Sequence, residues 1–231
     1  MGLFMSVWRT RPETVAIVFG LLLQACGNVQ VLEDRKAATG IQSHEKISVI
    51  LDRSAIKDAE DAEAMELDME ECIADALAEL EPPVGIVPTK TFRDMVFPDI
   101  DYLSVPSSPE SLFELMTSAD FQTRIRRLGL RYLLVLHSEY SSNAKPVGGC
   151  FGGPGGGVCL AFIVWDNQTK LSAQVIDVGN GLNTGNITTQ VTGHPWVGIV
   201  LVFPLGFPVF TEGTACRNFG EQVAAFIAGK P

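Results

Sequence analysis

Short stretches rich in β-branched and other apolar residues recur along this chain, and such stretches are typical of β-strands. The stretches that predict strands are residues 46–52, 131–140, 160–165 and 171–178, with weaker candidates at 85–97 and 187–192. In one of the weaker candidates, Pro88 indicates the start or the edge of a strand. The polar residues 166–170 separate two strong stretches and predict a hairpin turn.

Three other segments place their apolar residues three or four positions apart, which predicts amphipathic helices. The first covers residues 58–80 and ends at a pair of prolines. The second covers residues 109–128, with Ser107 or Ser108 as its N-cap and Gly129 as its end. The third begins near residue 213, and its apolar face consists of Cys216, Phe219, Val223, Phe226 and Ile227.

The predicted elements follow one another in the order β-α-β-α-β-β-β-α. This order predicts an α/β (α+β) fold with a mixed sheet, in two or three layers. Residues 45–231 are enough for one sizeable core and therefore for a single domain. A hydrophobic content of 46% with 19% charged residues is that of a folded globular chain.

The N-terminal residues follow a different pattern. Arg9 and Arg11 precede an uncharged apolar run over residues 15–26, which ends in an alanine and Cys26. A positive segment, a short apolar run and a small residue at the cleavage point are the features of an export signal. The run is shorter than the roughly 20 apolar residues that a membrane-spanning helix needs. Residues 1–25 are therefore predicted to be a signal peptide.

Residues 23–26, with the sequence Leu-Gln-Ala-Cys, resemble the lipobox of bacterial lipoproteins. The resemblance implies that Cys26 is acylated and becomes the new N-terminus, and that Gly27 directs the protein to the outer membrane, on its periplasmic side. A lipid with several acyl chains anchors a protein stably to a membrane. Residues 26–44 are polar and show no periodicity, so they predict a flexible tether.

Two other interpretations fit part of this N-terminal sequence. Residues 1–6 match the short N-myristoylation pattern. The apolar run is also compatible with a buried helix that happens to end at Cys26. A myristoylated cytosolic protein would have no use for the apolar run, and the combination of charge, length and cleavage cues favours an export signal.

The chain is acidic, with 17 basic and 27 acidic residues and a formal net charge of −10. Removal of the signal peptide and its two arginines leaves the remainder still more acidic. Such a surface repels nucleic acids and anionic lipid headgroups. Nucleic acid is therefore excluded as a partner, and membrane attachment is expected to come from the lipid.

Five cysteines are present, and lipidation of Cys26 would leave Cys72, Cys150, Cys159 and Cys216. An even number in an oxidising compartment indicates disulfides, and three pairings are open. We favour Cys150–Cys159, which flank a glycine-rich loop, together with Cys72–Cys216, which lie on two predicted helices. The alternative is four reduced and buried thiols. No metal site is predicted, because the cysteine spacing is not C-x-x-C and no histidine lies near the glycine-rich loop.

Two segments carry unusual composition. Residues 148–157 are glycine-rich but lack the Lys-Ser/Thr ending of a phosphate-binding loop, so they predict a flexible loop. Residues 194–212 are long and apolar, and are compatible with a flap on their own domain, a subunit interface or a surface that dips into the membrane. The interface candidates in these segments are Phe151, Trp196, Val200, Phe203 and Phe207.

Residues that could carry chemistry are sparse. His137 and Glu139 lie two positions apart on a predicted strand, and such residues share one face of a sheet. Asp52 and Asp177 lie near strand ends and form a weaker candidate pair. The chain contains neither G-x-S-x-G nor H-E-x-x-H. No catalytic residue and no cofactor are predicted.

The helix-to-strand junction at residues 128–135 and the strand 171–178 with Gly179 resemble the domain shared by the amino-terminal part of TolB and the outer-membrane lipoproteins CsgG, LpoB and PelC. Members of this group assemble, secrete or activate partners and share no enzyme activity. Residues 148–157 and 194–212 depart from the group's pattern. The resemblance implies a role that depends on partners and not on catalysis.

We therefore expect a lipid-anchored periplasmic binding or scaffold protein of the cell envelope. It is expected to act without catalysis, through self-association or an envelope protein partner. The alternative is a small periplasmic hydrolase that uses His137.

Overall fold

The computed structural model describes residues 28–54, 59–153, 156–200, 203–207 and 211–229, and for residues 59, 147–162 and 196–207 it describes the backbone alone. The chain forms two compact units. The larger unit contains Val29–Ser141, Gln168–Thr192 and Phe210–Pro231, and the smaller unit contains Met1–Asn28, Ser142–Asn167 and Gly193–Val209. Two long strands, β4 (Leu130–Gly153) and β5 (Gly156–Asp177), contribute residues to both units.

The larger unit is built on a mixed sheet with the strand order β1-β6-β5-β4-β2-β3. β2 pairs in parallel with β3 and with β4. Glu139 contacts Lys170, and Ser172 contacts the backbone of His137. β4 and β5 are therefore antiparallel, because the residue numbers along β5 fall as those along β4 rise. The strands are β1 (Asn28–Arg35), β2 (Lys46–Leu51), β3 (Gly85–Ile86), β4 (Leu130–Gly153), β5 (Gly156–Asp177) and β6 (Leu182–Gly193).

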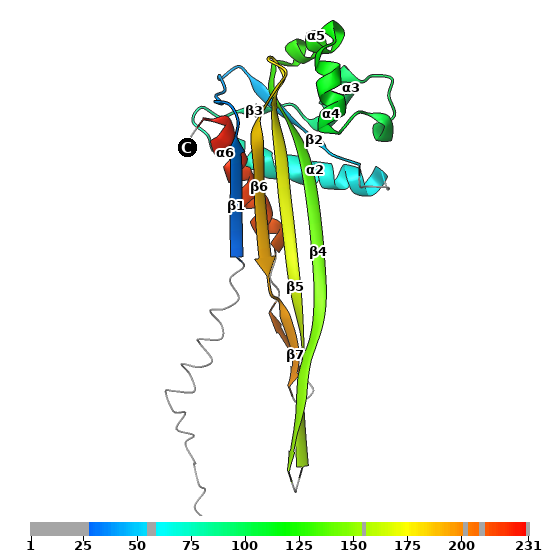
Figure 1. The fold of residues 1–231 in the computed structure, drawn as a ribbon, viewed down its shortest axis with the longest axis vertical. Coiled ribbons are helices and arrows are strands. Elements are labelled where there is room, and N and C mark those ends of the chain that lie inside the picture. Colours follow the sequence, from blue (N-terminus) through cyan, green and yellow to red (C-terminus); the bar gives the residue numbers. More distant parts are fainter. Residues whose placement is uncertain (1–27, 55–58, 154–155, 201–202, 208–210, 230–231) are drawn as a thin grey trace, which may run out of the picture. The chain divides into compact units, whose positions relative to one another are not determined.

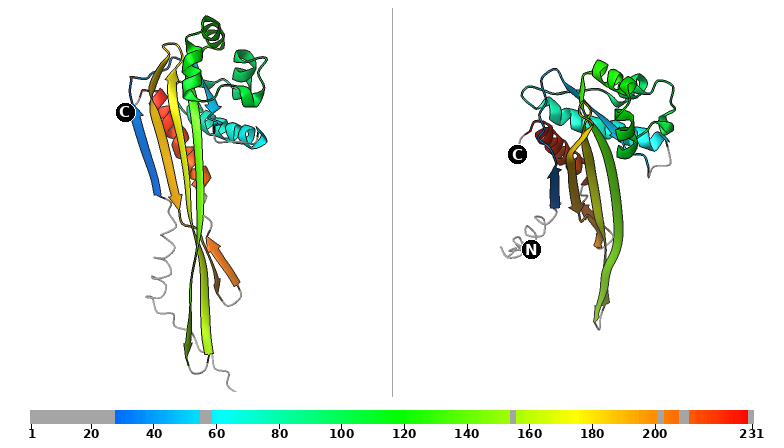
Figure 2. Two further views of the ribbon diagram at one scale, coloured as in Figure 1. Left: turned by 45° about the vertical axis from the view of Figure 1, so that its right-hand side comes forward. Right: turned by 45° about the horizontal axis from the view of Figure 1, so that its top comes forward.

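Helices cover both faces of this sheet. The α-helices of the described residues are α2 (Ala59–Ala78), α3 (Thr89–Val96), α4 (Pro109–Met116), α5 (Ala119–Leu128) and α6 (Thr211–Ile227), with a short 3-10 turn, η2 (Tyr102–Ser104). α2 and α6 pack on one face, and α3, α4 and α5 pack at one end of the other face (Figures 1 and 2). The larger unit therefore has three layers, with the mixed sheet between two layers of helices. This arrangement confirms the predicted α/β fold class.

Alternation along the strands divides the core into two clusters, because successive side chains of a strand point to opposite faces. On β2, Ile47, Val49 and Leu51 face α2 and α6, whereas Ile50 faces the layer of α3, α4 and α5. β4 divides in the same way, with Leu134 on the first side. Each cluster is therefore buried where helices cover its face of the sheet.

A disulfide joins the two helices of the first face. Cys72 on α2 is bonded to Cys216 on α6, with their Cα atoms 5.6 Å apart. The helices approach closely beside this bond, since a Cβ added to Gly220 would lie 2.7 Å from the carbonyl oxygen of Cys72. The predicted Cys72–Cys216 pair is confirmed.

A buried ion pair links α2 to the opposite layer. A carboxylate oxygen of Glu66 lies 2.9 Å from Nη1 of Arg93, and their side chains are 2% and 11% exposed. The other oxygen of Glu66 accepts a hydrogen bond from the backbone N–H of Leu51, at 3.0 Å. The guanidinium groups of Arg93 and Arg53 each stack on the ring of Tyr102. Burial raises the pKa of Glu66 above its ordinary value, against the lowering effect of the Leu51 N–H and of Arg93.

Residues 28–35 form strand β1, so the flexible tether expected over residues 26–44 is wrong from Asn28 onward. The segment that follows β1 is also held, since Arg35 and Thr39 both donate to the carbonyl oxygen of Phe226 at the end of α6. β1 can approach β6 because of Gly185, which has φ +151° and whose added Cβ would lie 2.3 Å from the carbonyl oxygen of Asp34. The prediction was wrong here because five of the eight residues of β1 are polar or charged, and Val29 is its one residue that packs against the described core cluster.

The segment after β1 offers a direct test of this docking. The hydroxyl of Tyr132 accepts from the backbone N–H of Gly40 at 3.1 Å and donates to its carbonyl oxygen at 3.0 Å. Tyr132→Phe should therefore lower the free energy of unfolding by about 1–2 kcal/mol, because both bonds are lost from a residue that is 1% exposed. Urea unfolding would measure this loss. An unchanged midpoint would contradict the docking of residues 36–40 on the sheet.

The strand predicted over residues 85–97 is wrong for most of its length. Only Gly85–Ile86 form a strand, and α3 occupies Thr89–Val96. The buried residues of α3 are Thr89, Phe92, Arg93 and Val96, which have helical spacing. β-branched composition was misleading because tertiary burial of this helical face outweighs the local strand preference.

The helix predicted over residues 109–128 is divided in two, between Met116 and Ala119. The hydroxyl of Thr117 donates to the carbonyl oxygen of Glu114, a local bond that competes with continuation of the helix. Both predicted ends are confirmed. The side chain of Ser108 caps α4, and Gly129 ends α5 in the left-handed conformation, with φ 68°.

The described part of the smaller unit contains paired strands. β7 (Trp196–Val200) pairs antiparallel with the Ala161–Val164 part of β5, and β8 (Phe203–Phe207) pairs antiparallel with β7. The residues expected to form a hairpin turn at 166–170 instead continue β5, and the glycine-rich residues expected to form a loop belong largely to β4 and β5. The polar residues of the supposed turn make cross-strand bonds: Asp166 contacts Lys145 and His194, and Asn167 contacts Ser142.

Several predictions concern residues or side chains outside the described part of the chain. The signal peptide 1–25 and the lipidation site Cys26 lie outside the described residues. The side chains of Cys150 and Cys159, the second predicted disulfide, also lie outside them. The same holds for the side chains of the interface candidates, Phe151, Trp196, Val200, Phe203 and Phe207.

Candidate functional site

Part of the second sheet face lies beyond the layer of α3, α4 and α5, and there its side chains are polar. Towards one end of β4 and β5, Leu133, Val135, Ile176 and Val178 are buried under those helices. Further along β4, β5 and β6 the same face carries His137, Ser172, Gln174, Asn186 and Thr188, all half-buried. We call these five residues the polar face. The change from apolar to polar residues along the same strands marks where the helical layer ends.

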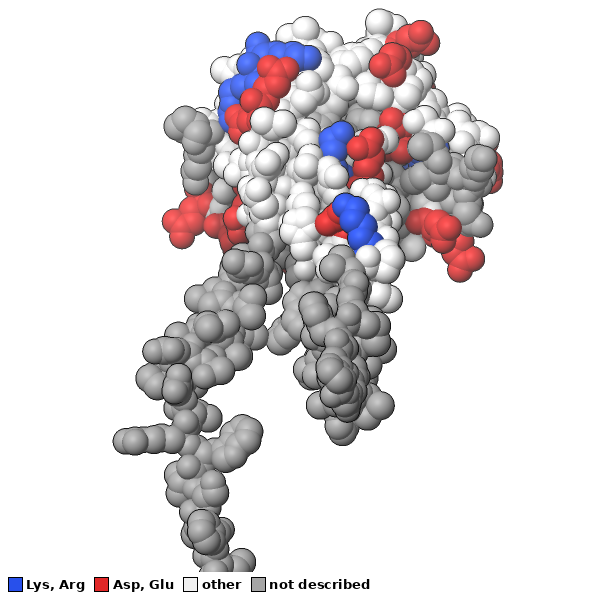
Figure 3. All heavy atoms as spheres, turned by 60° about the horizontal axis from the view of Figure 1, so that its bottom comes forward, with Lys and Arg blue, Asp and Glu red and all other residues white. Residues whose placement is uncertain are grey.

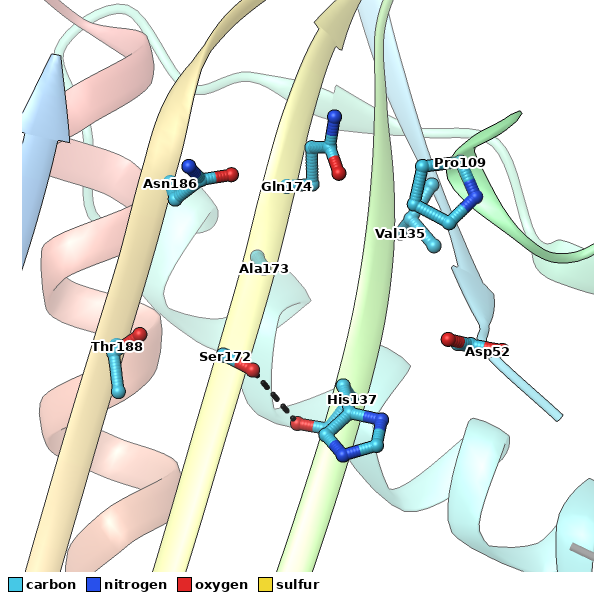
Figure 4. A pocket seen from close by; sticks show the side chains of 9 residues that line it. All are labelled: Asp52, Pro109, Val135, His137, Ser172, Ala173, Gln174, Asn186 and Thr188. Atoms are coloured by element: carbon cyan, nitrogen blue, oxygen red, sulfur yellow. Dashed lines mark hydrogen bonds between the residues drawn. The ribbon is translucent and has the colours of Figure 1, made fainter. Parts of the chain in front are cut away.

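The polar face forms the floor of a shallow pocket of about 260 Å³. Figure 4 shows Asn186 and Thr188 on β6, Gln174 and Ser172 on β5, and His137 on β4, in three adjacent rows. Asp52, which follows β2, and Pro109, which begins α4, stand at the rim.

Half of the polar side chains that line this pocket have no partner among the described residues. Within the described part of the chain, the side chains of Gln174, Asn186 and Thr188 make no hydrogen bond to another protein group. The hydroxyl of Ser172 makes a long bond of 3.5 Å to the carbonyl oxygen of His137. Half-buried amides and hydroxyls without protein partners remain available to a ligand.

His137 belongs to a chain of charged contacts at one side of the polar face. Its Nε2 lies 3.2 Å from a carboxylate oxygen of Glu139, whose other oxygen is 3.0 Å from Nζ of Lys170. The Lys170 ammonium, and then the His137 imidazole, lower the pKa of the exposed Glu139 carboxyl. The predicted pair of His137 and Glu139 is thus present, because residues two apart on a strand share a face.

The pocket brings together Asp52, His137 and Ser172, the residue types of a hydrolase triad. The hydrogen bonds that join the side chains of such a triad are not formed among them. The hydroxyl of Ser172 meets the backbone of His137 and not its imidazole, which faces Glu139. A carboxylate oxygen of Asp52 accepts from the backbone N–H of Ser54. A nucleophile needs a hydrogen bond to its base, and the base needs a bond to its orienting acid. Neither bond occurs among these described residues.

The other predicted carboxylate pair is not formed. Asp177 lies at the end of β5 where it pairs with Arg131, at 2.8 Å. Arg131 stands at the start of β4, whereas Asp52 follows the end of β2, which runs parallel to β4. The two carboxylates therefore lie near opposite ends of β2. Within the described residues, no group of three or more His, Cys, Asp and Glu side chains is placed to hold a metal ion.

A second candidate surface is the free edge of the sheet at β1. Among the described strands, β1 pairs only with β6. Its second edge presents unpaired backbone N–H and C=O groups, which are able to pair with a strand of another chain. Val31 and Leu32 at the centre of β1 are 37% and 69% exposed. Sequence reasoning missed this surface because it assigned β1 to a tether.

The charge of the visible surface agrees with the acidic composition. Figure 3 shows acidic groups distributed over this side of the larger unit, and the few basic side chains each lie against an acidic one. Ion pairs of the larger unit include Lys170 with Glu139 and Arg124 with Asp120. No helix within the described ranges is long and apolar enough to cross a membrane.

The chain matches no family model and no curated protein sequence. Among solved structures it is similar to a PelC dodecamer from Paraburkholderia phytofirmans, with 14% identity, a TM-score of 0.40, and coverage of 89% of this chain and 99% of that chain. It is also similar to a putative neuraminyllactose-binding hemagglutinin homolog from Helicobacter pylori, with 6% identity, a TM-score of 0.36, and coverage of 84% and 88%. These likenesses are distant.

Proposed function

We propose that this chain is a lipid-anchored, non-catalytic binding or scaffold protein of the cell envelope, which acts through self-association or a protein partner. The observation that carries the proposal is the free edge of β1. Along the eight residues of β1, one edge is paired with no other described strand, and apolar side chains are exposed at the centre. Proteins usually shorten, cover or charge such an edge, because it recruits other strands. In β1 the charged residues Glu33, Asp34 and Arg35 protect only the second part of the edge, and the uncharged residues Asn28–Leu32 suit β-strand pairing with a second chain.

The disulfide supports the proposed compartment. Cys72 and Cys216 are bonded, and disulfides persist in oxidising compartments such as the bacterial periplasm. The proposed signal peptide over residues 1–25 and a lipid on Cys26 would deliver the chain to that compartment, and we propose the periplasmic side of the outer membrane as its location.

The geometry of the pocket supports a non-catalytic role. Its serine and histidine are not hydrogen-bonded through the atoms that an acyl-transfer reaction needs. The partner of His137 is Glu139, which is also held by Lys170 in an exposed network of charges. These contacts link charged side chains on the surface of the sheet, and His137 does not act as a base for Ser172.

The proposal is tested by Leu32→Lys in the full chain, purified from membranes in detergent. The wild-type protein should run as an assembly larger than one chain by light scattering, or cross-link to one envelope protein through β1. Leu32→Lys should weaken that association tenfold or more, since it places a charge at the centre of an apolar contact.

The matched control is Leu182→Lys, which changes a similarly exposed leucine (55%) at the start of β6. This variant should associate like the wild type. Equal loss in both variants, or no loss in Leu32→Lys, would overturn the role of the β1 edge.

A further inference from the structure

We propose that the polar face binds an uncharged, polyhydroxylated ligand of about one sugar ring. The proposal goes beyond a protein-binding role, because it concerns a different surface from the β1 edge. It rests on the arrangement of Gln174, Asn186 and Thr188, whose side chains have no hydrogen-bond partner in the described protein, at the floor of a pocket of about 260 Å³.

The spacing of these groups suits hydroxyls arranged around a ring. Neighbouring strands are about 5 Å apart, and residues two apart on one strand are separated by about 7 Å. Asn186 and Thr188 therefore form one row and Gln174 and Ser172 a second row beside it, as Figure 4 shows. The amides offer both donors and acceptors, and the hydroxyls do the same. A ligand with several hydroxyls can meet four such groups at once.

The charges around the pocket disfavour ionic ligands. Among the described residues that line it there is no lysine or arginine, so this lining offers an anion no ammonium or guanidinium group. Asp52 is the only carboxylate among the described lining residues, and one of its oxygens already accepts from the Ser54 N–H. Glu139 and Lys170 beside His137 neutralise each other. An uncharged ligand therefore fits the lining better than an ion of either sign.

The apolar part of the pocket is too small to bind an apolar ligand. The apolar lining consists of Pro109, Val135 and Ala173, and the last two are 4% and 2% exposed. The volume is below the range of about 300–1,000 Å³ typical of pockets for drug-sized ligands. A single ring with hydroxyl groups is the class that matches both the size and the lining.

The test is a titration of the 15N-labelled full chain in detergent, monitored by the side-chain amide signals of Gln174 and Asn186. The probes are glucose, galactose, mannose and N-acetylglucosamine, with glucuronate and glucosamine as charged counterparts. The neutral sugars should give saturable shifts with a Kd on the order of 1 mM, since few bonds form on an open surface. The charged counterparts should bind at least fivefold more weakly.

Gln174→Ala combined with Asn186→Ala should weaken sugar binding tenfold or more, read from the backbone signals of Thr188 and Ser172. Gln30→Ala removes an exposed amide from β1 of the same sheet and should leave binding unchanged. Ser172→Ala alone should weaken binding about threefold, and matching thermal unfolding curves would show that each variant is folded.

Cellotetraose distinguishes a sugar unit within a glycan chain from a free sugar as the ligand. Tighter binding of cellotetraose than of glucose assigns the site to a sugar unit within a glycan chain, and equal binding assigns it to a free sugar. Absence of saturable shifts with every neutral sugar, equal binding of the charged probes, or unaltered binding by the double variant would overturn the proposal. Each of these outcomes is independent of the assembly test at β1.

Discussion

Replacing Cys72 and Cys216 together with alanine is expected to lower the free energy of unfolding by about 3–5 kcal/mol. The bond closes a loop with a sequence separation of 144 residues, and a long loop gains much from closure in the unfolded state. It also joins α2 to α6, the two helices that cover the same face of the sheet. Alanine keeps a small apolar side chain at each position. Urea unfolding without reductant measures the loss.

The control uses dithiothreitol on the wild-type protein, which should reproduce the loss seen in the double variant. Any further loss on adding reductant to the double variant would reveal the second predicted bond, Cys150–Cys159. A double variant as stable as the wild-type protein without reductant would contradict the contribution of the Cys72–Cys216 bond.

Glu66→Ala is expected to destabilise the protein by about 3–5 kcal/mol, since it removes one partner of a buried ion pair. The guanidinium of Arg93, which is 11% exposed, would lose its closest partner. The N–H of Leu51 would also lose the acceptor that it contacts at 3.0 Å. Thermal unfolding at neutral pH measures the effect.

The matched control is Glu63→Gln, on the same helix and at the same arginine. Glu63 lies 3.3 Å from Arg93 but is 54% exposed, so its loss should cost less than about 1 kcal/mol. Equal effects of the two changes would contradict a buried role for Glu66.

The burial of Glu66 also predicts a pH dependence of stability. Because burial raises the pKa of Glu66, the folded chain holds a proton there more readily than the unfolded chain. The contribution of this group to stability is therefore largest at low pH and falls as pH rises from the ordinary pKa through the raised one. Glu66→Gln does not titrate and should remove this part of the pH profile.

Much of the fold follows from local pattern. The apolar run of β2 and the helical spacing of α2 and α6 matched the structure, because each of these elements buries one face in the core. The strand over residues 85–97 and the turn over 166–170 were wrong for different reasons. In the first, burial of Phe92 and Val96 on a helix outweighed β-branched composition. In the second, Asp166 and Asn167 were taken for turn residues, whereas they bond to side chains across the strands.

The site was only partly predictable. His137 and Glu139 stood out because two titratable residues at strand spacing form a recognisable pair. Gln174, Asn186 and Thr188 carry no motif, and their strand contexts show only an alternation of polar and apolar residues. That alternation indicates an uncovered face, but the sequence does not reveal where α3, α4 and α5 stop covering the sheet. The pocket depends on that boundary.

The early start of β1 restricts how an anchored molecule could meet a neighbour. The first residue of β1 is only two positions from Cys26, a distance of at most about 7 Å along the chain. A lipid on Cys26 would therefore be joined to β1 by almost no linker. Symmetric pairing of two β1 edges would be antiparallel and would set the two lipids at opposite ends of strands roughly 26 Å long. Both lipids can enter one leaflet only if the paired strands lie flat along the bilayer, so an upright dimer built on this edge would have to join two facing membranes.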